Sequence, residues 1–141
     1  VHGHGEAWRP LLHIRDAVDA YIHLLSVAST RARAQVFNIL HKNYRILELA
    51  HWVAEVLEQQ RAVEVMVKRY RGIDEEARSY YVLGDRVTEV IGFRAGRGTS
   101  QAIVEIWDAL ERKEFGLEPE NDPQYFNIRW IKEMAGKGAI A

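Results

Sequence analysis

The chain has 141 residues, a formal net charge of −1 and no cysteine. Its length suits one domain with a hydrophobic core, and 48% hydrophobic residues with little net charge exclude a disordered chain. The lack of cysteine excludes disulfides, cysteine-based zinc sites and thiol catalysis. No apolar run approaches the ~18 residues that cross a bilayer, and no basic excess suits a nucleic acid. We therefore expect a soluble, cytoplasmic protein with no membrane or nucleic-acid partner.

The first part of the chain alternates short apolar runs with amphipathic segments. Residues 11–14 and 36–40 are short apolar runs typical of buried strands. Between them the spacing predicts a helix that begins after Asp16, whose side chain is the expected cap. The apolar face of this helix consists of Val18, Tyr21, Ile22 and Leu25. Residues 46–57 repeat the helical spacing, with glutamates on the opposite side, and predict a second helix.

Strand and helix signals continue through the middle of the chain. Valines alternate over residues 63–67 as in a strand, and residues 80–82 predict a short extended segment. Residues 85–91 predict a short helix that Gly92 ends. Another helix is predicted from Thr99 or Ser100, with a core face of Ile103, Ile106, Trp107 and Leu110.

The C-terminal part is more polar. Residues 105–122 hold seven acidic and two basic residues, which is typical of a solvated face and loop. Asp122 followed by Pro123 predicts a helix start, because proline is favoured at the first helical position. The closing helix carries Phe126, Trp130 and Met134.

Strands that alternate with helices predict an α/β fold, here helix-rich with three or four short strands. So few strands make a poor sheet whose edges expose unpaired amides. The order of elements therefore indicates a partial lobe that belongs to a larger sheet.

Several stretches also resemble a known family. They read G-E-A-W-R-P-L-L-H-I-R-D at 5–16, V-F-N-I at 36–39, N-Y-R-I-L-E-L-A at 43–50, R-S-Y at 78–80 and G-F at 92–93. In order and spacing, over about residues 3–115, they resemble the C-terminal, substrate-binding half of extended short-chain dehydrogenases/reductases. These are the NAD-dependent nucleotide-sugar epimerases and dehydratases. One departure is Leu40, where the family usually has a glycine that permits a tight turn.

Complete members of that family carry an N-terminal dinucleotide-binding domain with a glycine fingerprint and a Tyr-x-x-x-Lys pair. Neither motif is in this chain: no tyrosine is followed four positions later by lysine, and Gly92, Gly96 and Gly98 have the wrong spacing. The resemblance therefore implies that residues 1–141 are a single substrate-binding domain, inactive alone. NAD is implied only for the complete enzyme, and we predict no catalytic or cofactor-binding residue here.

Arg9 and Arg78 are the predicted substrate-binding residues. Arginines at these positions of the family contact the phosphates or ribose of the nucleotide, and bidentate bonds from arginine to a diphosphate are short and strong. A structural ion pair is the alternative explanation for each. The basic wall could be extended by Arg69, Arg71, Arg94 and Arg97.

Other candidate residues are explained by structure. His2 and His4 are spaced like metal ligands on a strand, but no third ligand follows at a diagnostic spacing, so we predict no metal site. His13 lies in an apolar run and is expected to be a hydrogen-bonded core residue. For Trp8, beside Arg9, both core packing and stacking on a nucleobase stay open.

Two functions from different classes follow. The first is the nucleotide-diphosphate-sugar binding portion of an epimerase or dehydratase, whose partner is the missing dinucleotide-binding domain. The second is a non-catalytic binding or assembly module that self-associates, in which a second copy covers the open strand edges.

Overall fold

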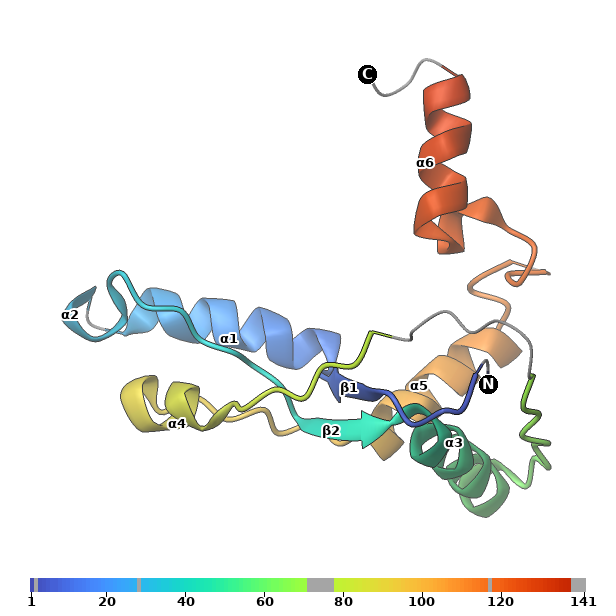
Figure 1. Cartoon of the computed structure of the whole chain (residues 1–141), viewed down its shortest axis with the longest axis horizontal. Coiled ribbons are helices and arrows are strands. Elements are labelled where there is room, and N and C mark those ends of the chain that lie inside the picture. Colours follow the sequence, from blue (N-terminus) through green and yellow to red (C-terminus); the bar gives the residue numbers. More distant parts are fainter. Residues whose placement is uncertain (2, 28, 71–77, 117, 138–141) are drawn as a thin grey trace. The chain divides into compact units, whose positions relative to one another are not determined.

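The structure is a computed structural model that describes residues 1, 3–27, 29–70, 78–116 and 118–137. Its contacts divide the chain into two compact units, residues 1–105 and 106–141 (Figure 1). The elements of the first unit are β1 (Trp8–Leu11), α1 (Ile14–Ser26), α2 (Ser29–Ala32), β2 (Lys42–Arg45), α3 (Ile46–Arg61), α4 (Asp85–Ile91) and the start of α5 (Thr99–Glu111). The second unit holds the end of α5, a 3-10 helix (Pro123–Tyr125) and α6 (Asn127–Gly136).

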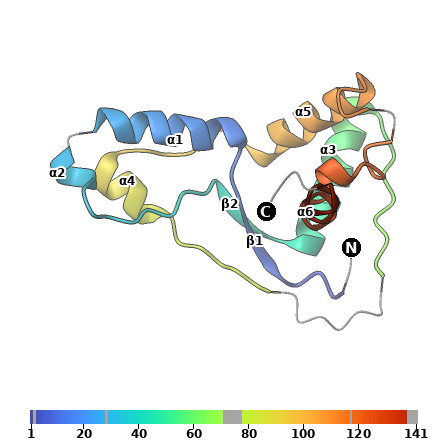
Figure 2. The same cartoon turned by 90° about the horizontal axis from the view of Figure 1, so that it is seen from above.

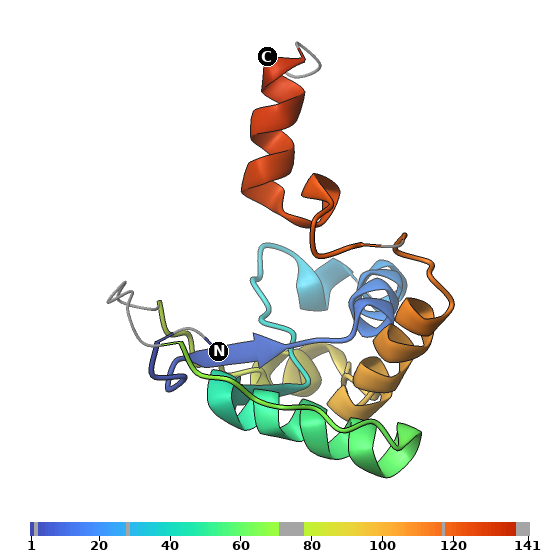
Figure 3. The same ribbon diagram turned by 90° about the vertical axis from the view of Figure 1, so that its right-hand side faces the viewer.

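The sheet of the first unit has two strands. β1 and β2 are antiparallel, in a register that pairs Trp8 with Arg45 and Leu11 with Lys42. α3 continues directly from β2 and lies beside the start of β1, where the N–H of Leu47 donates to the carbonyl of Gly5 at 2.9 Å (Figure 3). Together with the helices, this sheet confirms the predicted class, a helix-rich partial α/β lobe.

The predicted strands agree only in part with this sheet. The strand expected at 11–14 lies earlier, at β1, and residues 36–40 and 63–67 are extended without forming a strand. Side chains alternate as predicted at 63–67. Residues 36–40 were predicted to be buried, but only Phe37 and Ile39 pack against the core, and Val36 is exposed. The apolar pattern thus identified the side chains that turn inward at 63–67 but not at 36–40. A strand also needs a neighbouring backbone, and the described residues provide none for 36–40.

The start of α1 corrects a second prediction. The residue that caps α1 is His13, whose Nδ1 accepts from the N–H of Arg15 at 3.1 Å. Asp16 lies inside the first turn, where it is 3% exposed, so the prediction that it caps the helix was wrong. His13 is buried, with Nε2 3.1 Å from Oε2 of Glu105, which confirms the prediction of a hydrogen-bonded core histidine.

The other helix boundaries follow the sequence closely. α3 and α4 occupy the predicted segments, and Gly92 ends α4 with φ +77°. The Asp122 side chain accepts from the N–H of Gln124, with Pro123 at the first position, as predicted, but the element that it caps is the short 3-10 helix. The closing helix, α6, begins only at Asn127, so Phe126 precedes it and is not part of it. No helix in the described part of the chain combines the length and apolarity needed to cross a membrane.

A small core lies between α1 and α4, which run side by side in Figures 1 and 2. Its buried residues are Ala20, Val87, Ile91 and Phe93. His23 of α1 adds a polar tie, since its Nε2 lies 2.7 Å from the carbonyl oxygen of Ile91. α1 therefore turns Ala20 and Leu24 inward, and its other large apolar side chains are exposed.

Candidate functional site

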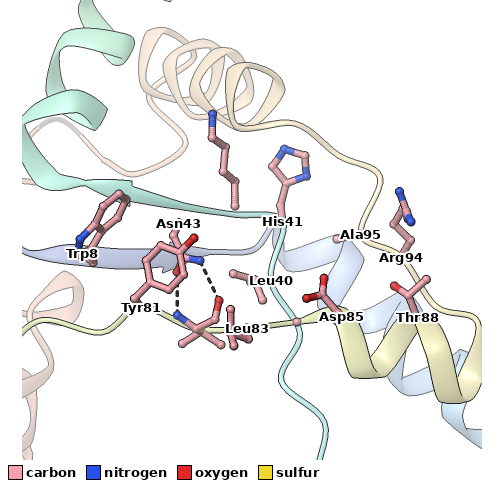
Figure 4. Close-up of a pocket in the computed structure, with 13 residues that line it drawn as sticks. Trp8, Leu40, His41, Asn43, Tyr81, Leu83, Asp85, Thr88, Arg94 and Ala95 are labelled. Carbon is pink, nitrogen blue, oxygen red and sulfur yellow. Dashed lines mark hydrogen bonds between the residues drawn. The ribbon is translucent and has the colours of Figure 1, made fainter.

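A cavity of about 680 Å³ lies in the first unit, beside the start of β2 (Figure 4). Its walls come from β1, residues 40–43, residues 81–85 with the first turns of α4, and residues 94–95. Small-molecule sites in proteins are typically of this size. In Figure 4, Trp8 and Tyr81 lie at one end, and Arg94 and Thr88 lie at the other.

The first end of the cavity is aromatic. The rings of Trp8 and Tyr81 meet edge to face, with centroids 5.1 Å apart and planes at 89°. The guanidinium carbon of Arg45 lies 5.2 Å from the Trp8 ring. These contacts hold the Trp8 ring in place within the first unit. Stacking of the same ring on a ligand stays a prediction.

Asn43 holds the segment that carries Tyr81. Its Nδ2 donates to the carbonyl of Val82 at 2.8 Å, and its Oδ1 accepts from the N–H of Val82 at 3.1 Å (Figure 4). These are the two bonds that a neighbouring strand would make, here supplied by one side chain. At the other side of the segment, the N–H of Tyr80 donates to the carbonyl of Trp8 at 3.1 Å. Residues 80–82, predicted to be extended, are therefore attached to the sheet without being a strand.

Gly84 makes room for Leu40 in the same wall. A Cβ at Gly84 would lie 2.4 Å from Cδ2 of Leu40. The side chain of Leu40 is thus accommodated by the missing side chain of Gly84. Sequence reasoning gave no role to Asn43 or Gly84. The only signals were an amide inside a matched motif and a glycine just before a helix.

The second end of the cavity is polar. Arg94 makes no hydrogen bond or ion pair with the residues that the structure describes. The hydroxyl of Thr88 donates to the carbonyl of Phe93 at 2.8 Å and so fixes the turn before Arg94. His41 and Asp85 complete this end (Figure 4). A free guanidinium here can bind an anionic group.

The structure brings Arg9 and Arg78 together, but outside this cavity. Nη1 of Arg9 donates to the carbonyl of Trp8 at 2.8 Å and to the carbonyl of Arg78. The guanidinium carbon of Arg9 lies 5.8 Å from the centroid of the Tyr80 ring. Because successive side chains of a strand point to opposite faces, Arg9 and Trp8 lie on opposite sides of β1. Neither Arg9 nor Arg78 lines the cavity.

Apart from Arg94, the other arginines of the predicted basic wall bind groups of the protein itself or lie outside the described residues. Nη2 of Arg69 donates to the carbonyl of His4 at 2.8 Å. Nη1 of Arg97 is 2.6 Å from Asp16 and from Asp19, which neutralise it. Arg71 and His2 lie outside the described residues. Among the residues that are described, no group of three or more metal-ligating side chains could hold a metal ion.

Two carboxyl groups near α1 have a lowered pKa. Burial alone would raise the pKa of Asp16, but hydrogen bonds from the backbone and side chain of Arg97 and the backbone of Gly96 lower it below its ordinary value. The pKa of Glu105 is lowered mainly by the hydrogen bond from Gln101 and further by the bond to His13. Asp16 binds Arg97, and Glu105 of α5 binds His13, so both carboxylates hold the start of α1 in place. These contacts explain the two lowered pKa values without a ligand.

Comparison with known proteins identifies the fold and no family. No family model matches the sequence, and neither does any curated protein. A solved structure of RMD from Pseudomonas aeruginosa, complexed with NADPH, is similar over 80% of this chain, with a TM-score of 0.58 and 22% identity. The chain spans 35% of that protein. It therefore shares its fold with about a third of an NADPH-bound protein.

Proposed function

We propose that the chain is the nucleotide-diphosphate-sugar binding portion of an NAD-dependent epimerase or dehydratase of the extended short-chain dehydrogenase/reductase type. On its own it is inactive, and a dinucleotide-binding domain completes it in the cytoplasm. The resemblance over residues 3–115 supports this, as does the likeness to a third of an NADPH-bound protein. The observation that carries the proposal is the contact between Arg9 and the backbone of Arg78.

The two arginines suit a diphosphate. Nη1 of Arg9 is engaged by backbone carbonyls, which fixes the guanidinium, while its Nη2 and Nε make no bond to the described residues. The ring of Tyr80 supports the same guanidinium. With the exposed Arg78 beside it, the pair offers two sets of charge-assisted donors to neighbouring phosphates.

The cavity offers a second position for the same ligand. There the phosphates would face Arg94, and the base or sugar would lie toward Trp8 and Tyr81. Variants of different arginines separate the two positions, because Arg94 lies in the cavity and Arg9 lies across β1 from it.

The test is calorimetric titration of the chain with UDP-, dTDP-, GDP- and CDP-sugars. We expect at least one to bind, and Arg9→Gln and Arg78→Gln each to weaken binding by roughly tenfold, equal to about 1.4 kcal/mol. Arg33→Gln, an exposed arginine in the turn after α2, is the matched control and should change nothing. If only Arg94→Gln loses binding, the ligand binds in the cavity and not at Arg9 and Arg78. Failure of all four nucleotide sugars to bind would reject the proposal.

The implied enzyme activity has its own test. Co-expression with a dinucleotide-binding domain of the family should yield epimerase or dehydratase turnover that neither part shows alone. Turnover by the isolated chain would contradict the proposal, since the chain has no Tyr-x-x-x-Lys pair.

A further inference from the structure

The two arginines of the proposed site and the cavity lie on opposite faces of β1. On the cavity side, the rings of Trp8 and Tyr81 have centroids 5.1 Å apart. On the other side, the ring centroid of Tyr80 lies 5.8 Å from the guanidinium carbon of Arg9. Each face thus holds one residue of β1 and one of the extended segment beside it, because consecutive side chains of extended backbone point to opposite faces. A ligand bound on one face therefore leaves the other face open.

The aromatic end of the cavity can hold a nucleobase. Tyr81 is 61% exposed, so a face of its ring is open to a planar group. The ring is fixed in place, since Trp8 meets it edge to face and Asn43 binds both backbone groups of Val82, the next residue. Every nucleobase has a π-face that stacks on such a ring, and a ring that is already fixed loses little freedom when a ligand binds.

The polar end of the cavity suits one phosphate and not two. Arg94 makes no hydrogen bond or ion pair with the residues that the structure describes, so its guanidinium can bind a phosphate. The ammonium of Lys42 is engaged elsewhere, 5.0 Å from the centroid of the Tyr44 ring. Asp85 also lines this end (Figure 4), where its carboxylate would repel a second phosphate and can accept from the hydroxyls of a ribose.

We propose that the cavity binds a nucleoside monophosphate, with its base on Tyr81 and its phosphate at Arg94. The volume of about 680 Å³ lies in the range of small-molecule sites. The nucleotide sugar of the proposed function binds at Arg9 and Arg78, so the chain holds two ligands at once, one on each face of β1. Only the identity of this second ligand rests on the proposed function, because neither Arg9 nor Arg78 lines the cavity.

The first test is calorimetric titration of the chain with AMP, GMP, UMP and CMP and with the corresponding nucleosides. We expect at least one monophosphate to bind. Arg94→Gln should weaken its binding roughly tenfold and leave binding of the nucleoside unchanged, because the nucleoside has no phosphate. Tyr81→Leu should weaken the binding of both roughly tenfold, because both carry the base.

The matched controls are Arg33→Gln and Tyr21→Leu, at exposed positions of the same unit outside the cavity, and they should change neither affinity. Circular dichroism of each variant reports whether it folds. Failure of all four monophosphates to bind at about 1 mM would overturn the proposal. It would also be overturned if Arg9→Gln abolishes binding of the monophosphate and Arg94→Gln leaves it intact, because the monophosphate would then bind at the arginine pair.

The second test asks whether both faces are occupied together. The chain is saturated with the UDP-, dTDP-, GDP- or CDP-sugar that it binds and is then titrated with the monophosphate. We expect one further equivalent to bind with an affinity within about twofold of that for the free chain. Competition between the two ligands would contradict separate sites. If no nucleotide sugar binds, the proposed function fails, while the first test still decides the cavity.

Discussion

Asp16 joins α1 to the segment before α5 through its two carboxylate oxygens. One oxygen accepts from the N–H of Arg97 at 2.9 Å, and the other accepts from the guanidinium at 2.6 Å. The side chain is nearly fully buried, so the loss of its charge leaves donors unsatisfied. Asp16 therefore stabilises the folded chain only while its carboxyl group is ionised.

This dependence predicts a change of stability with pH. Because the pKa of Asp16 is lower in the folded chain than in the unfolded chain, its contribution is complete above about pH 4 and is lost as the pH falls through the folded pKa. Asp16→Asn should therefore cost about 2 kcal/mol at neutral pH and flatten the acid limb of a plot of unfolding free energy against pH. Urea titrations between about pH 2.5 and 7 measure both effects.

Asp19→Asn is the control for this variant. Asp19 contacts the same guanidinium but is half exposed, so its charge contributes less. An acid limb that is unchanged in Asp16→Asn would refute the assignment.

Asn43 predicts a second effect at the scale of one residue. Asn43→Ala removes both bonds to Val82 and leaves a half-buried backbone pair without partners, which should cost about 2 kcal/mol in urea unfolding. Asn38→Ala removes a single, longer bond to the carbonyl of Leu83, at 3.3 Å, and should cost less than half as much. Equal losses in the two variants would mean that Asn43 does not hold the cavity wall.

At the scale of elements, α4 ends where the backbone turns left-handed. Gly92 has φ +77°, and its N–H donates to the carbonyl of Thr88 at 3.0 Å. Gly92→Ala should cost about 1 kcal/mol, because any side chain strains this conformation even though nothing lies within 4 Å of a Cβ. Gly96→Ala has equal space without positive φ, so thermal unfolding should show no loss there. A similar loss at both glycines would argue against strain.

The elements also show how far local pattern extends. α3, α4 and the cap at Asp122 were predictable because their signals, periodicity and cap residues, act within a few positions. The cap of α1 was not, because His13 and Asp16 are both able to cap and the choice depends on Arg97, far along the chain. The strand expected at 36–40 failed for a related reason, since pairing needs a partner that the pattern does not contain.

Of the two candidate binding positions, the sequence pointed to the one at Arg9 and Arg78 and not to the cavity. Family resemblance singled out Arg9 and Arg78, and the structure has them in contact, although their role as ligands of phosphate stays a prediction. The cavity was not predictable, because Trp8, Arg94 and Tyr81 come from three separate segments.

The sequence by itself determined the α/β class, most helix boundaries and the apolar spacing of α1, because periodicity and capping are properties of neighbouring residues. Only the tertiary structure decided which side of α1 is buried. The small side chain of Ala20 lets α1 approach α4, and this contact turns Val18, Tyr21 and Leu25 outward. The same holds for the cavity, whose shape depends on Asn43 holding Val82 and on Gly84 admitting Leu40. Such contacts join residues some forty positions apart, and no local pattern specifies them.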